Sequence, residues 1–162
     1  MQKELVNKPE IKLVGLSART NNKSEMNPNT AKIAALAGEF WSQSIGNQIL
    51  NRVNPGITLA VYTAYASDEH GDYTYFIGEE VSSFEQVPST LHQLTIPATQ
   101  YCKFTTPTGQ MPGVVIQAWQ QIWSLSQDSF GGNRAYQADF EVYDERAIDP
   151  QKPSLDIYIG IK

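Results

Sequence analysis

Apolar and polar residues alternate along several short segments of this chain, with the period of two that is typical of β-strands. Two other segments, 30–44 and 114–126, place apolar residues at helical spacing instead. Loops rich in glycine, proline and asparagine separate the segments. The pattern predicts strands at 11–19, 57–66, 73–81, 101–107, 138–144 and 155–162, with a polar connection at 82–100. The sequence therefore predicts an α+β fold with an antiparallel-rich sheet and two main helices.

The order of predicted elements in residues 11–81 recurs in residues 101–162. Trp41 and Trp123 are 82 residues apart, and Tyr62 and Tyr143 are 81 apart. The Ile-Gly pairs that begin at positions 77 and 159 are also 82 apart. These near-equal offsets predict a duplicated β-α-β-β unit with pseudo-two-fold symmetry. We expect one domain, residues 1–162, in which the two helices flank a ligand cleft.

The C-terminal hairpin carries the strongest candidate chemistry. Its strands are joined by a polar loop that contains Pro150 and Pro153. Alternation places Glu141 and Tyr143 on one face of the first strand, and Asp156 and Tyr158 on one face of the second. If the aliphatic faces meet the core, these four side chains share the other surface. An acid among aromatic rings suits an organic cation, whereas a solvated sheet face is the alternative interpretation.

The repeat places Ala60 at the position of Glu141 and Phe76 at the position of Tyr158, so only one half carries the acid. A cleft for a single monovalent cation needs one carboxylate and rings from both halves. A buried, unpaired carboxylate would cost several kcal/mol. We therefore expect hydroxyl donors close to Glu141, and the candidates are Tyr62, Tyr143 and Tyr158.

Composition narrows the classes of partner. The net charge is −5 and no basic run occurs, which argues against direct nucleic-acid binding and favours neutral or cationic ligands. Cys102 is the only cysteine, so no intramolecular disulfide forms. His70 and His92 lack partners at metal-ligand spacing, so we expect no metal. No long apolar run occurs, and we expect a cytoplasmic protein without membrane contact.

Several segments together resemble a known family. They are FWSQSIGNQILNRVNPGITLAVYTAY, YTYFIGEEV, IPATQYCKFTTPTG, AWQQIWSLS and DFEVYDERAIDPQKPSLDIYIGIK. In combination they resemble the GyrI-like small-molecule-binding domain, also known as the bacterial effector-binding domain of AraC-type and multidrug-sensing regulators. The resemblance extends from about residue 11 to residue 162. It implies two pseudo-symmetric halves around a cleft, and a cation-binding carboxylate on the penultimate strand that aligns with Glu141.

The resemblance also implies a set of ligand-binding residues and a function. Regulators of this family carry a helix-turn-helix domain, for which no residues remain here. We therefore expect a free-standing domain that senses or sequesters lipophilic, cationic aromatic compounds, with a separate DNA-binding chain as an optional partner. The expected ligand-binding residues are Glu141 for charge, Tyr62, Phe76, Tyr143 and Tyr158 for stacking, Asp156 on the last strand, and Trp41, Trp119 and Trp123 as walls or core.

Two other functions stay open at this point. Some GyrI-like domains hydrolyse reactive electrophilic compounds, and Glu141 with a raised pKa could serve as the general base. A module that binds a large protein such as a topoisomerase is the other. Binding without catalysis is the preferred interpretation.

Overall fold

The computed structural model describes residues 1–149 and 151–162, so Pro150 of the expected polar loop lies outside the described residues. Eight antiparallel strands form one sheet in the order β1-β6-β8-β7-β3-β4-β2-β5. The strands are β1 (Gln2–Lys8), β2 (Ile11–Thr20), β3 (Thr58–Thr63), β4 (Tyr73–Glu80), β5 (His92–Ile96), β6 (Thr99–Thr105), β7 (Arg134–Tyr143) and β8 (Asp156–Ile161). The helices are α1 (Asn22–Glu25), α2 (Ile33–Ser42) and α3 (Gly113–Trp123), with 3₁₀ turns at Ile45–Gln48, Gln127–Phe130 and Glu145–Ala147. The expected α+β class is confirmed.

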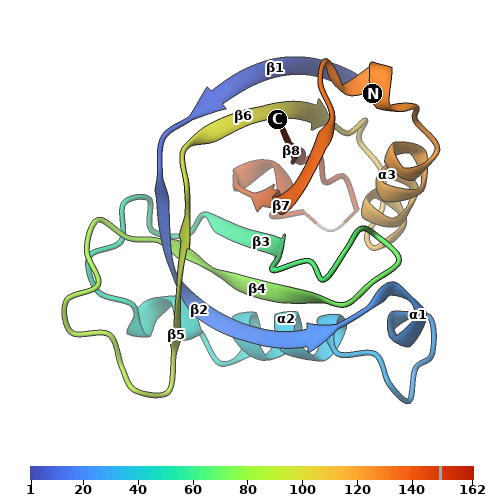
Figure 1. Ribbon diagram of the computed structural model, residues 1–162. Coiled ribbons are helices and arrows are strands. Elements are labelled where there is room, and N and C mark those ends of the chain that lie inside the picture. Colours follow the sequence, from blue (N-terminus) through green and yellow to red (C-terminus); the bar gives the residue numbers. More distant parts are fainter. Residues whose placement is uncertain (150) are drawn as a thin grey trace.

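The strand order is symmetric about the central pair β3 and β7. If β1, β2, β3 and β4 are exchanged with β5, β6, β7 and β8 respectively, the result is the same strand order read in reverse. Each half also gives its first strand to the other half, because β1 pairs with β6 and β5 pairs with β2. The sheet curves strongly, with α2 beside β2 and β4 and α3 in the half that contains β6 and β8 (Figure 1).

The two exchanged strands, β1 and β5, escaped the sequence analysis. β5 lies within residues 82–100, so the prediction of a polar connection there is wrong for that stretch. Both strands lie at the edges of the sheet and expose most of their side chains. Because an edge strand with few buried residues lacks a clean apolar face, its sequence resembles that of a loop.

The two main helices are held against the sheet by different devices. The carboxylate of Glu25 accepts the backbone N–H groups of Lys32 and Ile33 at 2.9 and 3.1 Å, which caps the first turn of α2. In α3, the buried residues Val114, Ala118, Trp119 and Ile122 follow helical spacing and face the sheet. This docking brings one face of each helix towards the central strands. Among the described residues, no helix is both long and apolar enough to cross a membrane.

The strand register decides which side chains share a face of the sheet. Glu141 is paired with Ala60 in β3 and with Ile157 in β8, whereas Phe140 is paired with Tyr158. Glu141 therefore shares its face with the aliphatic residues of β8, and Tyr158 points to the opposite side. The expected common surface of Glu141 and Tyr158 is wrong. All six residues of β8 are buried, so both of its faces meet a core, and alternation could not indicate which one faces the cleft.

Candidate functional site

Glu141 lies at the middle of the sheet and is 2% exposed. Its Oε2 accepts hydrogen bonds from the hydroxyl of Tyr62 at 2.9 Å and from the indole Nε1 of Trp119 at 2.6 Å. Its Oε1 accepts a hydrogen bond from the hydroxyl of Tyr143 at 2.6 Å. The donors come from β3, α3 and β7. Two of the three predicted hydroxyl donors are thus in place, and Trp119 supplies the third hydrogen bond in place of Tyr158.

The carboxylate has neutral donors and no counter-charge. Among the described residues, no basic side chain forms an ion pair with Glu141. Burial raises its pKa, while the hydrogen bonds from Tyr143, Trp119 and Tyr62 oppose that rise. Burial and the charge of Glu141 raise the pKa of both tyrosines, which keeps their hydroxyls protonated as donors. The site is a buried acid with three neutral hydrogen-bond donors.

A groove between α2 and α3 opens beside this acid and has two compartments. The α2 compartment has a volume of about 590 Å³ and is lined by Glu141, Tyr143, Ala37 and Trp41, together with the start of α3. The α3 compartment has a volume of about 460 Å³, and its lining includes Trp119 and Trp123 but not Glu141. The two adjoin each other, because they share the lining residues Ile33, Tyr62, Val115 and Ile116. A pocket of this size accommodates a drug-sized molecule.

Three tryptophans predicted as walls or core lie along this groove. Trp41 is 47% exposed, and its ring meets that of Tyr143 edge-on at 5.4 Å between centroids. Trp123 is 45% exposed and lies 6.2 Å from Trp119. Trp119 is buried, and its ring meets Tyr62 edge-on at 5.1 Å. Trp41 and Trp123 are therefore exposed walls at equivalent positions, while Trp119 is a buried wall that also donates to the acid.

Three other predicted residues are not brought to the cleft. Phe76 and Tyr158 belong to a core cluster on the opposite face, where Tyr158 stacks on Phe140 at 4.6 Å between ring centroids. Asp156 accepts hydrogen bonds from Thr105 at 2.7 Å and from Arg146 at 2.8 Å. The register of β8 is the reason, because it directs Asp156 and Tyr158 away from Glu141. The prediction that Asp156 and Tyr158 lie beside the acid is wrong, because it placed them on the wrong face of the sheet.

The sequence analysis missed Tyr75, which lines the α2 compartment. Tyr75 is paired with Tyr62 across β4 and β3, so both rings lie on the cleft face, 5.5 Å apart. A signal was present: in YTYF, alternation puts Tyr73 and Tyr75 opposite Phe76. Choosing Phe76 as the cleft residue excluded Tyr73 and Tyr75, which lie on the other face of the strand.

A second buried carboxylate lies on the cleft face near the α3 compartment. Asp139 accepts hydrogen bonds from Arg134 at 2.8 Å, from the Tyr65 hydroxyl at 2.6 Å and from the backbone N–H of Gly160 at 2.8 Å. Unlike Glu141, it has a cationic partner. We assign the buried ion pair of Arg134 and Asp139 a role in stabilising the fold.

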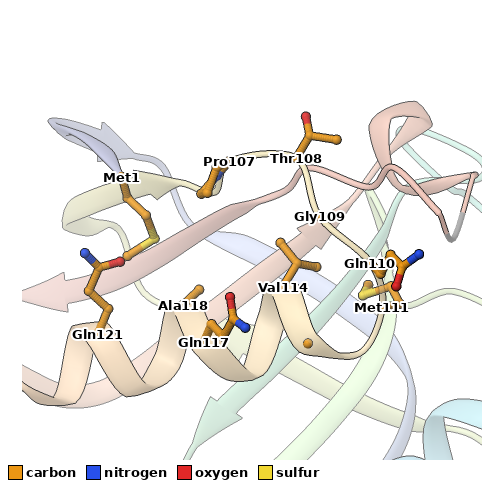
Figure 2. Close-up of a pocket in the computed structure, with 11 residues that line it drawn as sticks. Met1, Pro107, Thr108, Gly109, Gln110, Met111, Val114, Gln117, Ala118 and Gln121 are labelled. Atoms are coloured by element: carbon orange, nitrogen blue, oxygen red, sulfur yellow. The ribbon is translucent and has the colours of Figure 1, made fainter.

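A separate hollow of about 430 Å³ lies on the other side of α3, below the loop that follows β6 (Figure 2). Figure 2 shows Met1, Gln117 and Gln121 around it, with Thr108 and Gln110 on the loop. Its lining has no acidic or basic side chain. Its described side chains therefore offer no charge for recognition, and Glu141 with its groove is the candidate functional site.

Comparison with known proteins identifies the family of this chain. A family model described as "Cass2: Integron-associated effector binding protein" matches residues 4–161. The chain belongs to the Cass2 family. The predicted relationship to GyrI-like effector-binding domains is confirmed, and this Cass2-family chain is an effector-binding domain related to transcriptional regulators.

Individual relatives cover almost the whole chain. The integron cassette protein VCH_CASS2 of Vibrio cholerae is 26% identical, with a TM-score of 0.77 over 99% of this chain and 95% of that one. YobU of Bacillus subtilis (strain 168), named as a candidate transcriptional regulator, is 29% identical over 151 residues, 93% of this chain and 92% of YobU. The structure of SAV2435 bound to tetraphenylphosphonium has a TM-score of 0.77 over 100% and 94% of the chains, and at 17% identity it shows the shared fold.

Proposed function

We propose that this protein binds lipophilic aromatic cations reversibly in the groove, with Glu141 as the counter-charge. The observation that carries the proposal is a fully buried carboxylate that has three neutral donors, no described basic partner and a cavity beside it. Such a carboxylate is costly to bury alone, and a cation in the groove would offset that cost.

The rings of the groove explain the preference for an aromatic ligand. Trp41, Tyr62, Tyr75 and Tyr143 border the α2 compartment, so a flat or multi-ring cation would replace water with ring contacts. Ring faces also attract positive charge, more strongly when the ligand is desolvated. Tetraphenylphosphonium, the ligand named for SAV2435, has this chemistry, and the shared fold supports the same ligand class here.

In the cell we propose a free-standing sensor or sequestering module. The relationship to YobU supports a role in regulation. The ligand leaves unchanged, because Glu141 acts as a charge and not as a base.

The test is titration of tetraphenylphosphonium against the neutral triphenylphosphine oxide, followed by tryptophan fluorescence. Glu141→Gln is expected to lose about 1–3 kcal/mol of affinity for the cation, or about 5- to 150-fold, and little for the neutral ligand. Glu39→Gln is the matched control, since Glu39 is an exposed acid on α2. Equal losses for both ligands would remove the charge argument. Recovery of intact ligand after long incubation separates binding from hydrolysis.

A further inference from the structure

Each groove-lining position of α2 has a groove-lining counterpart in α3 under the internal repeat. Ile33 and Ala34 in α2 match Val115 and Ile116 in α3, and Trp41 matches Trp123, each 82 residues apart. At the same offset, Ala37 matches Trp119. The groove is therefore built on a symmetric plan in which one indole, at position 37, is missing.

The missing indole has a consequence at Glu141. Among the described residues, Oε2 accepts two hydrogen bonds, from Tyr62 and from Trp119, whereas Oε1 accepts one, from Tyr143. Each carboxylate oxygen can accept about two hydrogen bonds. Tyr62 and Tyr143 are counterparts under the repeat, so the donor that Oε1 lacks is the counterpart of Trp119.

The space for that absent donor is present. Ala37 and Glu141 both line the α2 compartment, whereas Trp119 lines the α3 compartment. Trp41 stands in the α2 compartment, edge-on to Tyr143, and bounds the space with an aromatic wall. The α2 compartment thus brings together Oε1 of Glu141, which can accept a further hydrogen bond, and the ring of Trp41. It does so beside Ala37, the position at which α3 has Trp119.

We propose that the α2 compartment seats one planar heteroaromatic ring of the ligand in the place of the missing indole, and that a cationic N–H of that ring donates to Oε1 of Glu141. Ala37 is then the residue that determines specificity, because its small side chain leaves the seat empty. This inference rests on the proposed function and narrows the ligand to flat aromatic cations that carry an N–H donor. A quaternary cation of the same shape supplies charge but no hydrogen bond.

The first test compares 9-aminoacridinium, which has N–H donors, with 10-methylacridinium, a flat monocation without one. The wild-type protein is expected to bind the first about tenfold more tightly, the value of one charge-assisted hydrogen bond. The preference should disappear in Glu141→Leu, which has no hydrogen-bond acceptor at this position. A ratio below about twofold in the wild type would overturn the donor part of the proposal.

The second test places a large side chain at position 37, in the part of the α2 compartment proposed to hold the ligand ring. Ala37→Trp is expected to weaken both acridines by at least about thirtyfold, because the new indole occupies their place. Ala35→Trp is the matched control, since Ala35 is exposed on the same helix and lines neither compartment, and it should bind like the wild type. Circular dichroism and thermal unfolding check that each variant folds. If Ala37→Trp does not fold, Ala37→Leu decides, with a smaller loss in the same direction.

The outcomes separate this inference from the proposed function. Folded Ala37 variants that bind like the wild type, combined with a cation-selective loss in Glu141→Gln, would overturn the seat and leave cation binding standing. A wild-type protein that binds none of these cations would overturn both.

Discussion

Ala60 and Glu141 are directly paired across β3 and β7, the two central strands of the sheet. They are 81 residues apart, the same offset as Tyr62 and Tyr143, so each is the counterpart of the other under the repeat. A pair of mutual counterparts lies on the pseudo-two-fold axis. The two tyrosines therefore approach a single carboxylate from related positions, and each donates to a different oxygen. One acid therefore accepts hydrogen bonds from tyrosines of both halves.

Cation affinity should depend on pH through Glu141. Burial raises the pKa of this carboxyl above the ordinary value of 4.5, and only the ionised form attracts a cation. Affinity for tetraphenylphosphonium is therefore expected to fall as the pH is lowered through that raised pKa, while affinity for triphenylphosphine oxide stays constant. Fluorescence titrations between pH 4 and pH 8 measure both. A parallel fall for the neutral ligand would indicate loss of fold instead.

Removing one tyrosine donor should move this pH dependence. The hydrogen bonds from Tyr62 and Tyr143 lower the pKa of Glu141, so Tyr62→Phe or Tyr143→Phe should raise it. The midpoint of cation binding is expected to shift to higher pH in both variants. Tyr158→Phe removes a hydroxyl from the opposite face and serves as the control. An equal shift in that control would contradict the assigned faces.

The ligand-free protein should be stabilised by Glu141→Gln at neutral pH. A carboxyl whose folded pKa is raised above its unfolded value contributes stability below the unfolded pKa and loses it as the pH rises through the folded pKa. The variant lacks this loss. The free energy of unfolding of the variant minus that of the wild type should therefore be larger at pH 8 than at pH 5. Urea unfolding at the two pH values gives the comparison. A difference that does not change with pH would contradict the raised pKa.

Breaking the buried pair of Arg134 and Asp139 should be far more costly than breaking a surface pair. Arg134→Met is expected to cost about 3–5 kcal/mol, because it leaves the fully buried Asp139 without its cation. Arg146→Met removes a partly exposed partner of Asp156 and should cost about 0–1 kcal/mol. Denaturant unfolding measures both values. Similar small losses would show that Asp139 needs no cationic partner.

Local sequence patterns were sufficient to locate most of the strands and helices and to assign them to two related halves. Local patterns located β2, β3, β4, β6, β7 and β8, and helical spacing located α2 and α3. The offset between Tyr62 and Tyr143 made Ala60 the counterpart of Glu141 before their pairing was known. β1 and β5 were missed because exposed edge strands carry little apolar periodicity.

The sequence by itself determined that one half carries an acid on its central strand and that the other half carries alanine there. Only the tertiary structure decided which rings surround that acid. Both faces of β8 are buried, so its alternation allowed either orientation, and the register with β7 turned Tyr158 away from the cleft. The docking of α3 across that face brought the Trp119 indole to 2.6 Å from Glu141, a contact between residues 22 positions apart that no local period encodes.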